Sequence, residues 1–167
     1  MKWVIPFLQR PLRVPYVAQM EAVECGAACL AMVLAHHGHH VPLSEVRETC
    51  AVSRDGVNAL AILRAAENYG LNAKAYRAEL KGLEQVALPA ILHWNFSHFV
   101  VLERLARDGG ARVVDPAQGR IGWQALEGQV GDFIAVVYQG NLWLVDSGSG
   151  VSYQVTGDGL VTRIDWK

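Results

Sequence analysis

A cysteine at the start of an apolar run is the residue best placed for chemistry. In QMEAVECGAACLAMVLAHHG, residues 19–38, Cys25 stands where polar residues give way to Ala, Leu and Met. This composition predicts a helix over residues 25–37, ended by Gly38. Unpaired N–H groups in its first turn would lower the pKa of Cys25, and Cys29 lies one turn deeper. Cys25 is therefore either a nucleophile or, as expected for Cys29 and Cys50, a small core residue.

A thiol nucleophile needs a base and a group that orients the base. Four of the six histidines, His36, His37, His39 and His40, cluster at the other end of this helix. That end is roughly 18 Å from Cys25 at 1.5 Å per residue, too far for a base. Neighbouring imidazoles can bind metal, but a solvated helix end explains them more simply, and we expect neither a metal nor a cofactor.

The remaining histidines, His93 and His98, lie in the second half of the chain. His98 opens the predicted strand HFVVLERL, and Asp115 ends the predicted strand ARVVD. If these strands form a hairpin, both residues reach the same sheet edge, although the sequence does not fix the register. His93 is explained as a strand residue, and Asp115 also suits a turn before Pro116. The order Cys, His, Asp is that of papain-like enzymes.

Three residues next to Cys25 complete the candidate site. The side-chain amide of Gln19 could donate to a developing oxyanion, together with the backbone N–H of Cys25. Gly26 leaves room beside the sulfur for a substrate carbonyl. Glu24 is expected only to favour the helix N-terminus as an anion.

Helices are expected first and antiparallel strands second, which predicts an α+β fold. A short helix is predicted from about Leu43, and a longer one within residues 53–70 has Leu60, Leu63 and Ala66 on its apolar face and ends at Gly70. A helical turn is expected over 80–86. Strands are expected at 71–77, 88–94, 98–106, 111–115 and 132–138, with turns at 107–110 and 115–119.

The composition excludes several classes of protein. The chain has 167 residues, a net charge of -1 and three cysteines, with no basic patch for nucleic acid. No apolar run reaches the roughly 18 residues of a membrane helix, and the start lacks a signal-peptide pattern, so we expect a soluble, unexported chain in a reducing setting. We expect one domain over residues 1–140 and a β-rich extension of unknown role over 141–167.

Three motifs in order resemble the N-terminal peptidase domains of bacteriocin and lantibiotic exporters, the double-glycine leader peptidases. The first is a Gln, four residues, an acidic residue and Cys-Gly, with a second Cys after two residues, which fits Gln19, Glu24, Cys25, Gly26 and Cys29. The second, an apolar strand leading to a His, fits PAILHWNFSHFVVL and indicates His98. The third, Asp-Pro followed by Gly, fits Asp115, Pro116 and Gly119.

The resemblance covers about residues 14–138 and is closest to a subgroup that exports peptides with nitrile-hydratase or Nif11-type leaders. It implies a papain-like cysteine protease whose N-terminal helical half packs on a C-terminal antiparallel sheet. The implied reaction is cleavage of a precursor peptide after Gly-Gly, with Cys25 as nucleophile, His98 as acid and base, Asp115 orienting His98, and Gln19 in the oxyanion hole. The leader would bind as a helix in an apolar groove.

Trp94 and Phe96 are candidate walls of a cleft that admits only glycine, although both also suit a core. The implied partners are the precursor peptide and the transmembrane and ATPase domains of an exporter, at the cytoplasmic face of the membrane. Members of the family usually continue into those domains, and the stretch after Gly140 matches nothing in the family. Two alternatives are a non-catalytic leader-binding domain and another papain-like acyl transferase.

Overall fold

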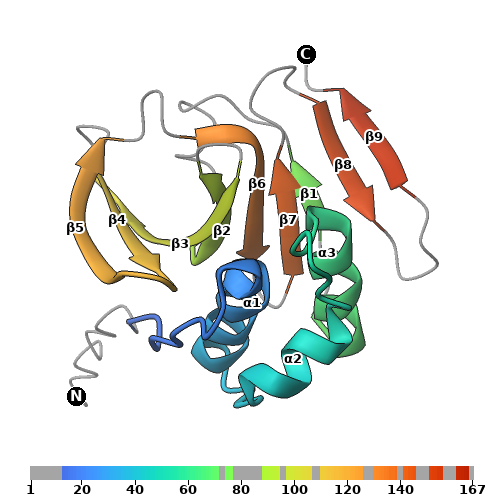
Figure 1. The fold of residues 1–167 in the computed structure, drawn as a ribbon. Helices are drawn as coiled ribbons and strands as arrows, with labels where there is room; N and C mark the ends of the chain where they lie inside the picture. Colours follow the sequence, from blue (N-terminus) through green and yellow to red (C-terminus); the bar gives the residue numbers. More distant parts are fainter. Residues whose placement is uncertain are drawn as a thin grey trace, which may run out of the picture.

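The computed structural model describes residues 13–71, 74–76, 88–94, 97–106, 110–125, 130–138, 141–145, 151–155 and 161–165. The helices come first: η1 (Ala22–Glu24), α1 (Cys25–His36), α2 (Leu43–Thr49) and α3 (Ala59–Asn68). The strands follow: β1 (Lys74–Tyr76), β2 (Ala90–Trp94), β3 (His98–Leu105), β4 (Gly110–Asp115), β5 (Gly119–Ala125), β6 (Val130–Tyr138), β7 (Asn141–Val145), β8 (Val151–Val155) and β9 (Val161–Asp165). This order confirms the predicted α+β class (Figure 1).

Helix α1 is the buried centre of the molecule. Every residue from Cys25 to Leu34 is buried, because this segment has no charged side chain and is apolar on all sides. It contacts β3 and β2 of the sheet as well as α2 and α3 (Figure 1). The position of α1 therefore fixes where Cys25 meets the strands.

Helix α3 differs in detail from the expected pattern. Its N-cap is Asn58, whose side chain accepts a hydrogen bond from the Ala61 N–H at 2.9 Å. The prediction that Leu60 lies on the apolar face is wrong, because Leu60 is 39% exposed. The buried face instead runs through Ile62, Leu63, Ala65 and Ala66. The helix ends before Gly70, as predicted, and the φ of Gly70 is +78°.

The strands form one sheet in the order β5-β4-β3-β2-β6-β1-β7-β8-β9. The predicted hairpin of β3 and β4 is antiparallel, with Val101 opposite Val114 and Leu102 opposite Val113. This register brings the start of β3 and the end of β4 to the same edge, as expected. Strand β5 was not predicted, and the helical turn expected over 80–86 lies outside the described residues.

Strands β7, β8 and β9 extend the sheet beyond residue 140. β7 pairs with β6 and β1, and β8 pairs with β7 and β9. The described residues of this segment lie in strands, and the division of the chain at residue 140 into a domain and an extension stays a prediction. Among the described helices, none has the length and apolar content needed to cross a membrane.

Gly26 allows a close approach between α1 and α3. A Cβ at this position would overlap Val57 Cγ1 and come within 2.8 Å of Ile62 Cδ1. We therefore expect Gly26→Ala to lower the free energy of unfolding by about 1–3 kcal/mol, as overpacking does. Urea denaturation measures this loss.

Gly122→Ala is the matched control, because a Cβ there meets nothing within 4 Å. Its free energy of unfolding is expected to stay close to that of the parent. Equal effects of the two substitutions would show that the packing at Gly26 is not tight.

Candidate active site

The fold brings together three of the predicted residues from three separate elements. Cys25 is the first residue of α1, His98 is the first residue of β3, and Asp115 is the last residue of β4. His98 hydrogen-bonds the Cys25 thiol on one side. On its other side, His98 Nε2 lies 2.9 Å from Asp115 Oδ1. The three side chains thus form a continuous chain from thiol to imidazole to carboxylate.

Asp115 is held by the turn that follows it. The carboxylate is almost fully buried, and its Oδ1 also accepts a hydrogen bond from the Ala117 N–H at 2.7 Å. Gly119 closes the turn with a φ of +91°, a value that glycine adopts without strain. Asp115 is therefore both a turn residue and the partner of His98, so the two readings of its sequence context are compatible.

The electrostatics favour a charged pair of thiolate and imidazolium. Burial alone would raise the pKa of Cys25, but hydrogen bonds from His98 and from the Phe99 and Gly26 N–H groups lower it below the ordinary thiol value of 9.0. The hydrogen bond with Cys25 raises the pKa of His98 to about 9; burial opposes this rise, and Asp115 adds to it. Each charge therefore stabilises the other.

The other two cysteines are core residues, as expected. Cys29 is completely buried, and burial followed by the nearby Cys25 charge raises the pKa of its thiol well above 9.0. Burial also raises the pKa of Cys50 to about 12. Among the three thiols, only that of Cys25 is prepared for reaction at neutral pH.

Gln19 lies beside the turn that carries Asp115. Its backbone N–H donates to the Pro116 carbonyl at 3.0 Å. Its side-chain oxygen is buried without a hydrogen-bond partner among the described residues, so that oxygen is not committed to another group. This location supports the prediction that Gln19 serves the site, and the role itself stays a prediction.

The structure places two of the three residues that were predicted to contact the substrate, Gly26 and Trp94. The space beside Gly26 is filled by Val57 and Ile62, so the glycine serves packing, while its N–H contributes to the pKa of Cys25. Trp94 lies directly opposite His98 across β2 and β3 and is half-buried. Phe96 lies outside the described residues. Substrate contact by these residues stays a prediction.

Three of the other histidines contact neighbouring rings. The ring of His93 packs on Phe99, with 4.8 Å between ring centroids. His36 and His37 lie edge to face at the end of α1, 5.1 Å apart. In the part of the chain that the structure describes, no group of three potential metal ligands is present.

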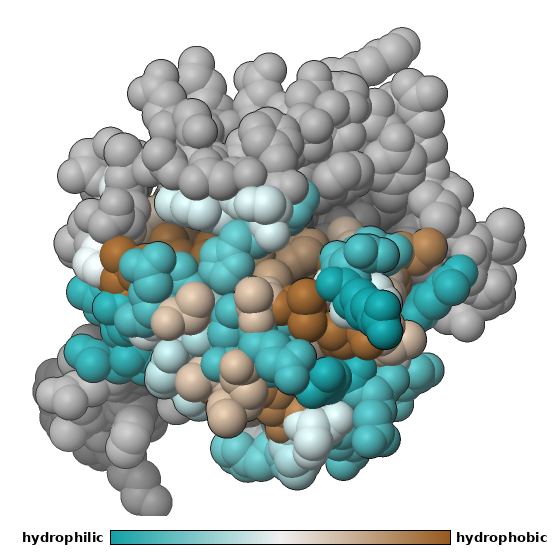
Figure 2. Space-filling view, viewed as in Figure 1, coloured by the Kyte–Doolittle hydropathy of each residue, from teal (hydrophilic) through white to brown (hydrophobic). Residues whose placement is uncertain are grey.

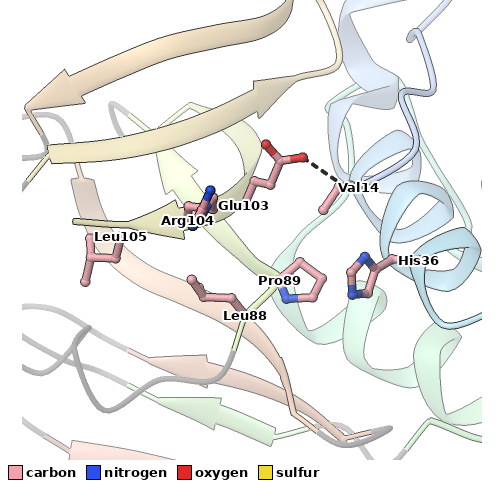
Figure 3. Close-up of a pocket in the computed structure, with 7 residues that line it drawn as sticks. All are labelled: Val14, His36, Leu88, Pro89, Glu103, Arg104 and Leu105. Atoms are coloured by element: carbon pink, nitrogen blue, oxygen red, sulfur yellow. Dashed lines mark hydrogen bonds between the residues drawn. The ribbon is translucent and has the colours of Figure 1, made fainter. Parts of the chain in front are cut away.

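Two hollows lie at opposite ends of α1. One of about 430 Å³ lies near the Cys25 end and is lined by Met20, Glu24, Leu43, Ser44, Arg47, Glu48, Ala51 and Val52. The other, of about 300 Å³, lies at the His36 end and is lined by Val14, His36, Leu88, Pro89, Glu103, Arg104 and Leu105 (Figure 3). Neither is lined by the Cys25, His98 and Asp115 side chains.

Glu24 has a larger role than the sequence suggested. It is 2% exposed, and its carboxylate accepts hydrogen bonds from the Met20 and Glu21 N–H groups. It also forms an ion pair with Arg47 of α2 at 2.8 Å. The position of Glu24 three residues after Glu21 is the local sequence signal for its hydrogen bond with the Glu21 N–H. The ion pair with Arg47 has no such signal, because Arg47 lies on another helix.

The chain is similar to known peptidases and processing transporters. The model of the Peptidase C39 family matches residues 13–127. A probable microcin-H47 secretion/processing ATP-binding protein of Escherichia coli is 44% identical over 110 residues, which cover 65% of this chain and 15% of the relative. A lactococcin-G-processing and transport ATP-binding protein of Lactococcus lactis subsp. lactis is 32% identical over 111 residues, 63% of this chain and 16% of the relative. The chain thus spans about a sixth of the length of these curated relatives.

Solved structures share the fold. A double glycine motif protease from an AMS/PCAT transporter, crystallised with the leader peptide, is 44% identical, with a TM-score of 0.70 over 84% of this chain and 96% of that chain. The peptidase domain of Streptococcus ComA, at 21% identity, has a TM-score of 0.66 over 80% of this chain and 99% of that domain. The predicted papain-like fold is confirmed.

The lowered pKa of Cys25 predicts selective alkylation. We expect iodoacetamide at pH 7 to add one label, at Cys25, because the other two thiols are buried and protonated. The His98→Ala substitution removes a group that lowers the pKa of Cys25. The burial of the thiol, which raises this pKa, remains. The pH at which the labelling rate of Cys25 is half-maximal, the midpoint, should therefore rise by about one pKa unit or more. At pH 7, such a rise makes labelling at least about tenfold slower.

Intact-protein mass spectrometry over pH 5–10 measures the rate, and Cys25→Ala provides the unlabelled control. An unchanged midpoint in the His98→Ala protein would contradict the thiolate–imidazolium pair.

Proposed function

The chain belongs to the Peptidase C39 family, and on this premise we propose that it is a cysteine endopeptidase that removes the leader of a bacteriocin- or lantibiotic-type precursor peptide after a Gly-Gly pair. One observation carries the proposal: Cys25, His98 and Asp115 are linked by hydrogen bonds in a chain that matches the family over residues 13–127. A domain that only bound leaders would not need this arrangement.

In the proposed reaction, the Cys25 thiolate attacks the carbonyl carbon of the second glycine, and the C=O bond becomes a tetrahedral oxyanion. Gln19 and the Cys25 N–H donate to this oxyanion. His98 gives its proton to the leaving amine, and the C–N bond breaks to leave a thioester on Cys25. His98 then takes a proton from water, whose oxygen attacks the thioester and releases the peptide acid and the thiolate.

Asp115 supports both halves of this cycle. Its hydrogen bond and its charge contribute to the raised pKa of His98, so the imidazolium needed to protonate the amine is present at neutral pH. The bond to Nε2 leaves the other ring nitrogen, Nδ1, for exchange with the thiol and the substrate. The carboxylate orients the ring without taking part in bond making.

Selectivity for glycine is consistent with the surroundings of His98. Directly paired residues on neighbouring strands project to the same face of a sheet, so the Trp94 indole lies next to the base. A bulky ring at this position would exclude branched side chains from the two residues before the scissile bond. We propose Trp94 as one wall of the cleft, with Phe96 as a second.

For the leader, we propose the hollow near the Cys25 end of α1 as the docking site. The crystallised double glycine motif protease holds a leader peptide, and an amphipathic leader helix needs an apolar groove with a polar rim. Leu43, Ala51 and Val52 supply apolar lining, and Arg47 and Glu48 supply charges. On the face in Figure 2, apolar patches lie among hydrophilic side chains over the helical part. Met20, 83% exposed, lies on the rim, one residue after Gln19.

The similar proteins carry secretion, processing and transport in their names, so we propose that cleavage is coupled to export. The partners would be the transmembrane and ATPase domains of an exporter, and the site would lie at the cytoplasmic face of the membrane. We propose that the precursor peptide carries a leader of the nitrile-hydratase or Nif11 type.

Incubation with a synthetic leader peptide that contains Gly-Gly tests the function. We expect one cut after the second glycine, seen by mass spectrometry, and a loss of at least 10⁴-fold in kcat for Cys25→Ala, because the nucleophile is removed. Replacing the second glycine by valine in the peptide should abolish cleavage on steric grounds.

Binding without cleavage by the unmodified protein would favour a leader-binding domain. Transfer of the acyl group to an added amine in preference to water, without dependence on Gly-Gly, would favour an acyl transferase. Equal cleavage by the parent and by Cys25→Ala would falsify the proposed mechanism.

The docking proposal predicts a separate effect of Met20→Ser. Because this side chain is exposed, its loss should leave folding unchanged and raise the KM for the full-length leader several-fold, with kcat retained. Leu60→Ser, on α3, removes another exposed apolar side chain and is the matched control. Steady-state kinetics of both variants measure the changes in KM and kcat separately. Equal KM values for the two variants would exclude Met20 from the leader site.

A further inference from the structure

We propose that Glu24 is a positioning residue that holds the Gln19 backbone where the side-chain amide reaches the oxyanion. This inference rests on the proposed function, since it assigns a role in catalysis to a group that borders the proposed leader hollow and takes no part in bond making. It begins from a buried carboxylate that stands directly before the nucleophile and that the reaction itself does not use.

The Glu24 carboxylate binds the backbone just after Gln19. Its Oε2 accepts the Met20 N–H at 2.8 Å and the Glu21 N–H at 3.0 Å. Charge-assisted bonds of this kind are stronger than those between neutral groups, particularly where water is excluded. The two bonds fix the direction in which the chain leaves Gln19.

The Gln19 backbone is fixed from the other side as well. Its N–H donates to the Pro116 carbonyl at 3.0 Å, next to Asp115. Three consecutive N–H groups, those of residues 19, 20 and 21, are therefore bound, one to the Asp115 turn and two to Glu24. A peptide held in this way has little freedom to move its side chain away from the site.

Arg47 neutralises the buried carboxylate. Its Nη1 lies 2.8 Å from Glu24 Oε1, and its Nη2 lies 3.5 Å from Glu21 Oε2. The Arg47 side chain is 42% exposed and comes from α2, so α2 contributes to the placement of the loop. Without such a partner, burying a charged side chain of a residue that is 2% exposed would be costly.

Glu24 acts on Gln19 rather than on the thiol. The hydrogen bonds that lower the pKa of Cys25 come from His98 and from the Phe99 and Gly26 N–H groups. Loss of the Glu24 carboxylate is therefore expected to leave the thiolate in place and to misplace the oxyanion donor. A displacement of about 1 Å at such a donor can cost on the order of 100-fold in rate.

A double-mutant cycle between Glu24→Ala and Gln19→Ala tests this role with the leader peptide as substrate. In the parent background, Glu24→Ala should lower kcat roughly 10- to 100-fold with little change in KM, because the interaction is made in the transition state. In the Gln19→Ala background, the same substitution should have almost no further effect on kcat. The rate at which iodoacetamide labels Cys25 should be the same in the Glu24→Ala protein and in the double variant as in the parent.

Glu24→Gln tests rescue, because its amide oxygen can still accept the Met20 and Glu21 N–H groups, although the ion pair with Arg47 is lost since the amide NH₂ is itself a donor. We expect it to recover most of the lost kcat. If Glu24→Ala does not fold, the cycle is run with Glu24→Gln, whose smaller loss must likewise disappear in the Gln19→Ala background. Additive effects with either variant would overturn the proposal.

Glu103→Gln is the matched control, because Glu103 of β3 binds the backbone at Val14, at the other end of the segment that leads to Gln19. Glu103 Oε1 accepts the Val14 N–H at 2.9 Å (Figure 3), and its side chain is 4% exposed. Loss of the Glu103 charge should lower thermal stability. Because Val14 lies five residues from Gln19, this variant should not displace Gln19, and its effect on kcat should be additive with that of Gln19→Ala. No cleavage by the parent would reject the proposed function, whereas cleavage with an additive Glu24 cycle would reject only the positioning role.

Discussion

The contact between Cys25 and His98 is the interaction on which the rest of the structure depends. Burial opposes the charge on each residue, so the thiolate and the imidazolium are stable only as neighbours. This requirement sets a distance that neither residue controls alone. It is met because α1, apolar on every side, packs against the buried strand β3 and cannot shift without opening the core.

The turn after β4 connects several parts of the site. Its first residue, Asp115, binds His98, and the next carbonyl, that of Pro116, accepts the Gln19 N–H. The same carbonyl accepts the Tyr16 hydroxyl at 3.2 Å. A five-residue turn thus places the group that orients the base and the segment that carries the proposed oxyanion donor, which links the N-terminal segment to the sheet edge.

Much of this arrangement could be predicted from the sequence, because local patterns determine it. The apolar run predicted α1 with Cys25 at its start, and Gly38 and Gly70 marked where helices end. Membership of the Peptidase C39 family confirms the resemblance drawn from three motifs in order. The sequence could not decide whether His98 meets Asp115, since that depends on the register of β3 and β4.

Features that escaped prediction depend on contacts between distant residues. Strand β5, GRIGWQA, is an exception, because Ile121, Trp123 and Ala125 alternate with Arg120, Gly122 and Gln124. This local period-two signal was present and was overlooked beside the turn 115–119, and the pairing with β4 identifies the strand. Leu60 looked like a core residue because helical periodicity does not state which side of α3 faces the protein. Glu24 resembled a simple helix-start anion because its partner Arg47 lies on another helix.

The long separation between nucleophile and base has a consequence for the protein while it is being made. His98 follows Cys25 by 73 residues and Asp115 by 90, and domains emerge from the ribosome N-terminus first. The helical part is complete before β3 and β4 exist, so the nascent chain carries a thiol without the imidazole that lowers its pKa. The contact with His98 that lowers the pKa of Cys25 forms only when the sheet closes on α1, and until then the thiol lacks this activation.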